Sequence, residues 1–277
     1  MVRRTTRRVA WLTAALGVAV TALSGTASAA PQWAPAATAA VHPGVQTYTN
    51  GGQCTANFVY SDGSHVYLGQ AAHCASTGNS NQTNGCDTPS LPLGTPVTVT
   101  GASRPGKLVY SSWLTMQAQH EKNPDTCAYN DLALIQLDPA DTGKVNPSIP
   151  FWGGPTALAA GAAKGGKVVS YGNSKLRAGI SLLSPKQGQI LDEQGGGWSH
   201  TVLTVTPGIP GDSGSAFLDS SGRALGILST LNILPTTGSN GVGDVARELD
   251  YMHTHSQFRD VELVPGTEKF RGTINLP

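Results

Sequence analysis

The chain has 277 residues, of which 18 are basic, 17 are acidic and 39% are hydrophobic. This length can form one large domain or two modest ones, and the near-balance of charge excludes the strongly basic surface of a nucleic-acid-binding protein. Four of the basic residues lie within the first eight positions, so the rest of the chain has more acidic than basic side chains. We therefore expect no nucleic-acid partner.

Residues 1–29 have the three parts of a secretory signal peptide. A basic start precedes an apolar run at 9–23, and the small residues Ala27, Ser28 and Ala29 follow. A membrane anchor is the alternative, but it needs roughly 20 consecutive apolar residues, more than this run provides. We expect export, cleavage after Ala29 and a secreted product without membrane attachment. The pair Arg7-Arg8 keeps a twin-arginine export route open beside the general one.

Residues 30–45 are rich in Ala and Pro and have no periodic apolar pattern. Such a composition is typical of extended, unpacked chain. We predict a flexible tail or a short propeptide here.

From residue 46 onward, short runs of β-branched and aromatic residues alternate with clusters of turn-forming residues, which predicts an all-β fold. The predicted strands are 57–60, 65–68, 96–100, 107–113, 131–137, 167–171, 201–205, 215–218 and 224–231. A Pro- and Gly-rich stretch at 146–166 separates an N-terminal unit, 46–150, from a C-terminal unit, 151–277.

One helix is predicted at 244–255. Val245, Leu249 and Met252 are spaced four and three residues apart, so they fall on one helical face. Asp244 is a suitable N-cap.

The four cysteines are Cys54, Cys74, Cys86 and Cys127. An even number in an exported chain predicts two disulfides, and three pairings are possible. The spacing contains no CxxC pair, so we expect no zinc site, no other metal and no cofactor.

Three short motifs indicate nucleophilic catalysis. Ser213 lies on a glycine-flanked turn, Gly211-Asp212-Ser213-Gly214, ahead of an apolar strand. A serine hydroxyl is a weak nucleophile unless a base takes its proton. His73 follows the strand HVYLGQ at 65–70 and is a candidate base. Asp131 lies immediately ahead of the apolar strand at 132–137 and is a candidate carboxylate to orient that base. A buried carboxylate without a partner would be costly, which favours this pairing.

These motifs, in the order His, Asp, Ser, resemble those of chymotrypsin-like serine proteases over roughly residues 51–255. The resemblance implies two antiparallel six-stranded β-barrels, an active site in the cleft between them and a C-terminal helix. His73 and Asp131 would come from the first barrel, and the nucleophile Ser213 from the second. The backbone N–H groups of Gly211 and Ser213 would form the oxyanion hole.

The same resemblance implies the disulfide pairing. It joins Cys54 to Cys74, which leaves Cys86 to pair with Cys127.

The resemblance also implies a buried ion pair for Asp212. In the family the partner is typically an amino terminus freed by zymogen cleavage, but no IVGG-like start precedes Gly51 in this sequence. A basic side chain such as Arg177 is the expected partner instead.

Four residues match the family's substrate pocket. Pro207 stands where trypsin-like enzymes carry an acid, so cleavage after basic residues is not expected. Ser229 and Leu231 match the pocket wall that pairs with an extended substrate, and Gly241 matches the opposite wall. We predict a restricted apolar pocket that accepts small or medium side chains.

Together these features predict a secreted, monomeric serine endopeptidase that forms an acyl-enzyme on Ser213 and acts on a protein or peptide. A catalytically silent binding protein with the same fold is the main alternative, because fold does not guarantee activity. An esterase with the same triad is a second alternative, against which the lack of a GxSxG elbow counts.

Overall fold

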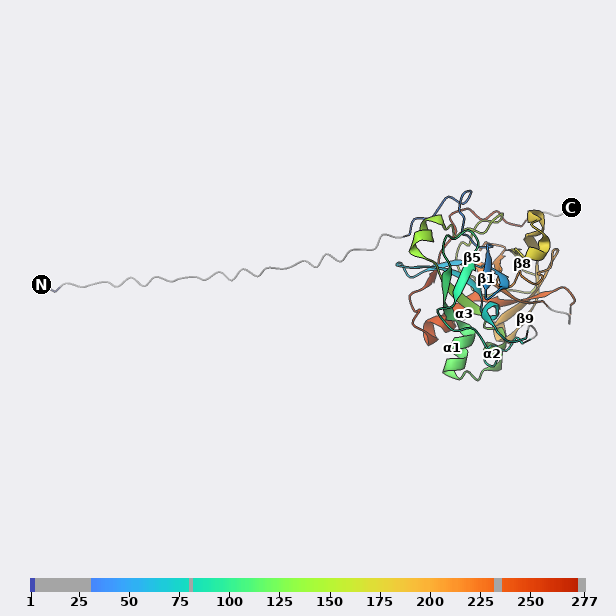
Figure 1. The fold of residues 1–277 in the computed structure, drawn as a ribbon, viewed down its shortest axis with the longest axis horizontal. Coiled ribbons are helices and arrows are strands. Elements are labelled where there is room, and N and C mark those ends of the chain that lie inside the picture. Colours follow the sequence, from blue (N-terminus) through green and yellow to red (C-terminus); the bar gives the residue numbers. More distant parts are fainter. Residues whose placement is uncertain (3–30, 80–81, 232–235, 274–277) are drawn as a thin grey trace.

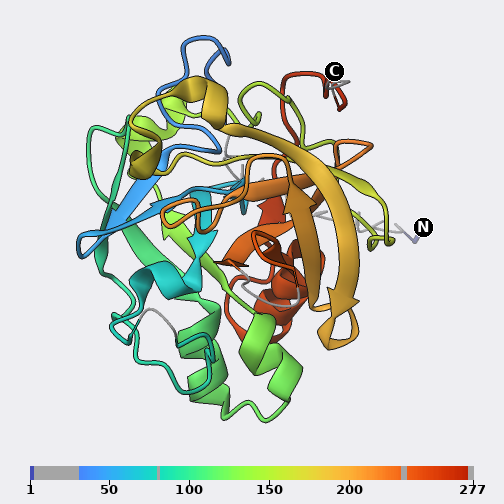
Figure 2. The same ribbon diagram turned by 90° about the vertical axis from the view of Figure 1, so that its right-hand side faces the viewer.

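The computed structural model describes residues 1–2, 31–79, 82–231 and 236–273, so the predicted signal peptide falls almost wholly outside the described residues. The described residues form two β-rich halves, as Figures 1 and 2 show, and three α-helices. The first half contains β1 Gln46–Thr49, β2 Gly52–Thr55, β3 Val59–Ser61, β4 Val66–Ala71, β5 Pro96–Val99, β6 Gly106–Ser111 and β7 Leu132–Gln136. The second half contains β8 Lys167–Tyr171, β9 Pro185–Gln194, β10 Ser199–Thr204, β11 Ala216–Asp219, β12 Ala224–Leu231 and β13 Asn240–Asp244.

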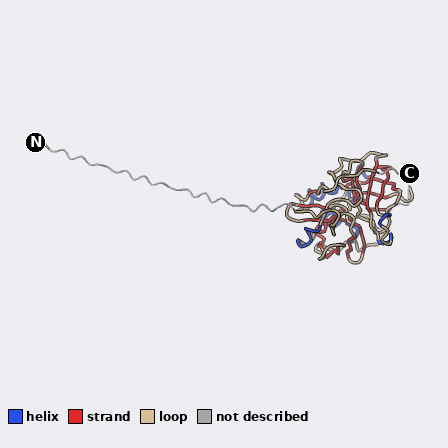
Figure 3. The backbone as a smooth tube through the Cα atoms, turned by 90° about the horizontal axis from the view of Figure 1, so that it is seen from above, coloured by secondary structure: helices blue, strands red, loops and turns tan. Residues whose placement is uncertain are grey.

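The remaining elements are short. The α-helices are α1 Ser112–Gln119, α2 Pro124–Tyr129 and α3 Val245–His255, and a last short strand is β14 Glu262–Leu263. Short segments of 3-10 helix are η1 Ala72–Ala75, η2 Pro139–Lys144, η3 Lys175–Arg177, η4 Ser181–Leu183 and η5 Gly195–Gly197. In Figure 3 strands and loops make up most of the body, and the helical segments are brief. No helix in the described ranges is long and apolar enough to cross a bilayer.

The second half is a closed antiparallel barrel of six strands, in the order β10-β13-β12-β11-β8-β9, which confirms the predicted barrel. Alternate residues of these strands point inward because successive side chains of a strand face opposite sides. The inward residues form a buried apolar core that includes Val168, Val202, Phe217, Leu228 and Val242.

The first half differs from its prediction. Its strands form an open antiparallel sheet, β14-β3-β4-β7-β6-β5-β1-β2, and the expected closed six-stranded barrel is wrong. β2 and β3 are consecutive in the chain, but the residues between them change partners: Ala56 N bonds Val45 O, and Asn57 N bonds Gly69 O. The outer edge of β3 is occupied by β14, through Glu262 and Leu263. The ladder therefore does not close.

The predicted C-terminal helix is confirmed as α3. The Asp244 side chain caps it by accepting a hydrogen bond from Arg247 N at 3.0 Å. Helices α1 and α2 were not predicted. The strand expected at 107–113 ends at Ser111, which caps α1, and Asn123 with Pro124 starts α2.

Residues 31–45 pack against the first sheet. Val41 is fully buried and bridges to Val145, and Trp33 packs on the same core. Ala34 N donates to Val145 O at 2.8 Å. This segment is therefore a packed part of the first half and not a free tail.

Two disulfides join the four cysteines. Cys54 pairs with Cys74, which links β2 to η1, and Cys86 pairs with Cys127, which links a loop to α2. Both pairings agree with those that the family resemblance implies.

Candidate active site

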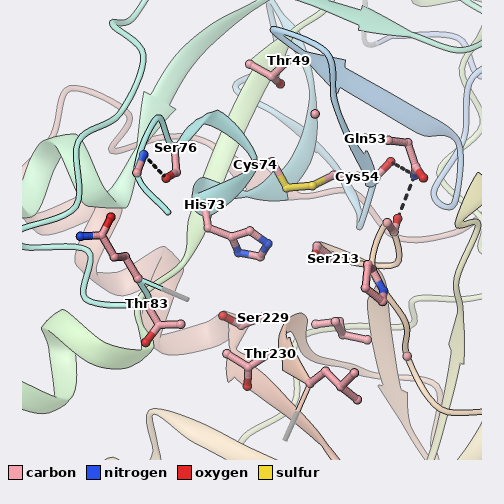
Figure 4. Close-up of a pocket in the computed structure, with 18 of the residues that line it drawn as sticks. Thr49, Gln53, Cys54, His73, Cys74, Ser76, Thr83, Ser213, Ser229 and Thr230 are labelled. Carbon is pink, nitrogen blue, oxygen red and sulfur yellow. Dashed lines mark hydrogen bonds between the residues drawn. A yellow bond between two sulfur atoms is a disulfide. The ribbon is translucent and has the colours of Figure 1, made fainter. Parts of the chain in front are cut away.

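A cavity of about 660 Å³ opens between the two halves (Figure 4). Its lining includes Gln53, His73 and Trp113 from the first half and Ser213, Ser229 and Leu231 from the second. In Figure 4 the His73 ring and Ser213 face the same open space, beside the Cys54–Cys74 disulfide.

The pairing of β4 with β7 brings His73 and Asp131 together. Ala71, at the end of β4, pairs with Leu132, at the start of β7, so the residues beyond these two positions emerge at the same end of the sheet. His73 Nδ1 lies 2.7 Å from Asp131 Oδ2, and His73 N donates to Asp131 Oδ1 at 2.8 Å. Ring and backbone of one histidine thus engage both carboxylate oxygens.

The carboxylate sets the protonation of the histidine. Asp131 is only 2% exposed. Burial acts to lower the pKa of His73, but the charge of Asp131 and its hydrogen bond outweigh burial and raise that pKa above 6.5. A proton on Nδ1, directed at the carboxylate, leaves Nε2 as the basic nitrogen.

Ser213 lies on a turn that both halves hold. Thr55 N donates to Ser213 O at 2.9 Å, and Gly214 N donates to Leu228 O at 2.6 Å. Gly214 has a φ of +87°, and a Cβ there would lie 2.6 Å from Thr55 O, so the close approach of β2 requires glycine. No hydrogen bond joins the Ser213 hydroxyl to His73 within the described part of the chain. Such bonds commonly tighten only when substrate is bound.

The backbone around Ser213 orients two N–H donors. Ser174 Oγ donates to Pro210 O at 2.6 Å, and Ser215 N donates to Asp212 O at 3.0 Å. The N–H of a trans peptide points opposite to its carbonyl. The N–H groups of Gly211 and Ser213 are therefore directed away from these anchors, and neither donates to another described residue.

Asp212 is fully buried beneath this loop and faces two cations. Arg177 Nη2 and Lys186 Nζ, the latter at 2.9 Å, both bond its Oδ2, and Ser174 N bonds its Oδ1 at 2.9 Å. The expected partner, Arg177, is present, whereas Lys186 was not anticipated. Burial acts to raise the pKa of Asp212, but the Arg177 hydrogen bond and the Lys186 charge outweigh it and lower that pKa. Burial lowers the pKa of Lys186 to about 8, against the opposing charge of Asp212.

The four predicted pocket residues are not equivalent. Ser229 and Leu231 line the cavity, whereas Pro207 and Gly241 do not. Pro207 directs its carbonyl to Arg177 Nη2 at 3.0 Å, and Gly241 is covered by the side chain of Thr230, whose Oγ1 would lie 2.3 Å from an added Cβ.

Asn240 joins two residues that line the cavity, Gly208 and Thr230. Its Oδ1 accepts from Gly208 N at 2.8 Å, and its Nδ2 donates to Thr230 O at 3.1 Å. Asn240 is fully buried. The sequence contains no signal for this role, because the glycines on either side of Val242 interrupt the apolar alternation of β13 and the burial of Asn240 appears only in the folded structure.

Ser229 has a second contact that was not predicted. Its Oγ donates to Asp131 Oδ2 at 2.5 Å, so a strand of the closed barrel contacts the carboxylate of the first half.

Among the described residues, one group has metal-ligand types close together: Cys54, His73 and Cys74. Both sulfurs are joined in a disulfide, so they offer no thiolate to a metal.

No protein-family model matches the sequence, and no curated protein matches it. Solved structures do match. Protease A of Thermobifida fusca is 18% identical, with a TM-score of 0.52, over 82% of this chain and 99% of its own. A glutamic-acid-specific serine protease, described as using a histidine triad in substrate binding, is 19% identical, with a TM-score of 0.51, over 81% of this chain and 100% of its own. This chain therefore has the fold of bacterial chymotrypsin-like serine proteases.

Proposed function

We propose that this chain is a secreted serine endopeptidase with Ser213 as nucleophile, His73 as general base and Asp131 as the orienting carboxylate. The observation that carries the proposal is the buried His73–Asp131 pair, which opens on the same cavity as Ser213. The two disulfides and the signal-peptide pattern support export to an oxidising compartment.

In the proposed reaction, Ser213 Oγ attacks the carbonyl carbon of the scissile peptide while His73 Nε2 takes the hydroxyl proton. The N–H groups of Gly211 and Ser213 stabilise the negative oxygen of the tetrahedral intermediate. His73 then gives its proton to the leaving amine, which leaves an acyl-enzyme on Ser213. A water molecule, deprotonated by His73, attacks this ester, and His73 then returns the proton to Ser213 Oγ as the acid product leaves. Asp131 stabilises the imidazolium at both stages.

The substrate is a protein or peptide in extended conformation. β11 pairs with β12 only as far as Ile227. The part of β12 at Ser229 and Leu231 therefore has a backbone edge that β11 does not occupy. A substrate strand added along this edge would direct its side chain toward the wall near Gly208.

The preferred residue before the scissile bond is small or of medium size and apolar. Asn240 occupies the space behind Gly208 and Thr230, and Leu231 stands at the entrance with 48% of its surface exposed. No acidic side chain lines the cavity in the described ranges, so a basic substrate residue would find no counter-charge there.

A fluorophosphonate probe tests the proposal, with the labelled residue located by peptide mass spectrometry. We expect wild-type protein to carry the label on Ser213 and Ser213→Ala to carry none. Absence of label on folded, secreted wild-type protein would favour the catalytically silent binding protein. Label combined with hydrolysis of small acyl esters and no peptide cleavage would favour the esterase.

A further inference from the structure

A third carboxyl group lies behind the His73–Asp131 pair. Glu248, in the first turn of α3, is fully buried, and its Oε1 accepts a hydrogen bond from Asp131 N at 2.8 Å. Its Oε2 has no hydrogen-bond partner within the described part of the chain. The C-terminal helix thus reaches the backbone of the triad carboxylate directly.

This contact completes the bonding of Asp131. Its carbonyl accepts from Ala72 N at 2.6 Å, and its carboxylate accepts from His73 and Ser229. The N–H is the one remaining polar group, and Glu248 is its acceptor. Without Glu248 a buried donor would lose its partner, which commonly costs more than an ordinary hydrogen bond gains.

The neighbouring backbone leaves room for this carboxyl group. A Cβ on Gly243 would lie 2.7 Å from Glu248 Oε1 and 3.2 Å from Tyr129 O. Glycine at the β13–α3 junction therefore lets the carboxyl group pass between β13 and the residues before β7.

The charges around Glu248 oppose its ionisation. The carboxylates of Asp131 and Asp244 repel a negative charge on Glu248, and the phenols of Tyr60 and Tyr110 also interact with it electrostatically. The neighbouring His200 lies 3.0 Å from Asp244. No lysine or arginine forms an ion pair with it among the described residues. Burial raises the pKa of Glu248 well above its usual value, the Asp131 charge adds to this effect, and the Asp131 N–H bond only partly opposes it.

We propose that Glu248 is a positioning residue whose uncharged carboxyl group holds the backbone of Asp131, and through it the carboxylate that faces His73. The inference rests on the proposed function of the His73–Asp131 pair. A neutral acid here fixes the position of Asp131 without adding a second negative charge next to the Asp131 carboxylate.

Two substitutions separate position from charge. Glu248→Gln keeps an acceptor oxygen for Asp131 N and is neutral, whereas Glu248→Met fills a similar volume without any acceptor. Leu249→Met is the matched control, because Leu249 is the adjacent buried residue of α3 and has no bond to Asp131. Thermal unfolding of each variant verifies that it folds.

We expect Glu248→Met to lower kcat about tenfold or more with little change in KM, which is the effect of losing a hydrogen bond in the supporting structure. Glu248→Gln and Leu249→Met should stay within about twofold of wild type. The acid limb of the kcat/KM profile should keep its midpoint in Glu248→Gln. A downward shift of about half a pH unit or more would mean that Glu248 carries a charge, because removing a nearby negative charge lowers the pKa of His73.

The proposal is overturned by that shift, by wild-type kcat in Glu248→Met, or by equal losses in the Gln and Met variants. A readout independent of turnover is the downfield NMR resonance of the His73 Nδ1 proton. It should persist in Glu248→Gln and move or broaden in Glu248→Met. In one outcome the fluorophosphonate does not label wild-type protein, while the His73 resonance persists in Glu248→Gln and moves or broadens in Glu248→Met. That result would refute the endopeptidase proposal and leave the positioning role standing. If the His73 resonance is the same in Glu248→Gln and Glu248→Met, the positioning role itself fails.

Discussion

The hydroxyl of Ser229 lies 2.5 Å from Oδ2 of Asp131, the same oxygen that faces His73 Nδ1. This contact crosses from β12 of the closed barrel to the residue before β7 of the open sheet. The geometry of the His73–Asp131 pair therefore depends on how the two halves dock.

Removal of this donor should change both rate and pH dependence. We expect Ser229→Ala to lower kcat about three- to tenfold, because a hydrogen bond to a buried charge is lost. Without the Ser229 hydrogen bond, the negative charge of Asp131 is less well stabilised and attracts the His73 proton more strongly. The pKa of His73 should therefore rise, and the acid limb of kcat/KM should move to higher pH. Steady-state kinetics from pH 5 to 9 tests both effects, and a limb that moves to lower pH would contradict the argument.

If the proposed activity holds, the pH at which kcat/KM of the wild-type protein rises should report the pKa of His73. Because the Asp131 charge raises the pKa of His73, kcat/KM should rise with pH through a midpoint above 6.5. Asp131→Asn removes the charge and should lower that midpoint, with a loss of about 10⁴-fold in kcat. An unchanged profile in this variant would show that the Asp131 charge does not control the pKa of His73.

The Asp212 site should carry a measurable pH dependence of stability. Native Lys186 has a pKa of about 8, whereas the unfolded chain holds the proton up to 10.5. Between these values the unfolded state binds more protons, so this group makes the free energy of unfolding rise with pH. Relative to Lys186→Met, wild type should gain up to about 3 kcal/mol over this interval. Urea unfolding at pH 7.5 and 10 measures the difference, and parallel curves would contradict it.

Arg177 is the other cation at this site, and Arg177→Ala is the complementary test. Breaking one partner of a buried ion pair should cost about 3 kcal/mol, at the lower end of the usual range because Lys186 remains beside Asp212. We also expect slower fluorophosphonate labelling, because Asp212 anchors the loop of Ser213. Unchanged stability and labelling would remove Arg177 from this role.

Asn240 should limit the size of the substrate residue. Asn240→Gly removes the side chain that bridges Gly208 and Thr230. The ratio of kcat/KM for Leu over Ala before the scissile bond should rise about tenfold or more, since a methylene in an apolar pocket is worth 10- to 200-fold. A peptide series with Ala, Val, Leu and Phe at this position makes the comparison. An unaltered ratio would place the specificity elsewhere.

Much of the local structure could be predicted from residue patterns. Alternating apolar runs marked β4, β7, β11 and β12, and the spacing of Val245, Leu249 and Met252 with the cap Asp244 marked α3. β9 and β13 escaped prediction because their glycines and polar residues interrupt the apolar alternation. The short helices α1 and α2 escaped because too few turns fit between their caps to show a period.

The sequence by itself determined which residue types were available: a serine on a glycine-flanked turn, a histidine after one strand, an aspartate before another, and four cysteines. The tertiary structure decided what surrounds them. The open first sheet, the Ser229 hydroxyl on Asp131, the second cation on Asp212 and the buried Glu248 all depend on contacts between residues far apart in the chain. Apolar periodicity and helix capping depend on a few neighbouring residues, so they cannot predict contacts between residues far apart in the chain. Only the docking of the two halves brings these residues together and removes water from between them.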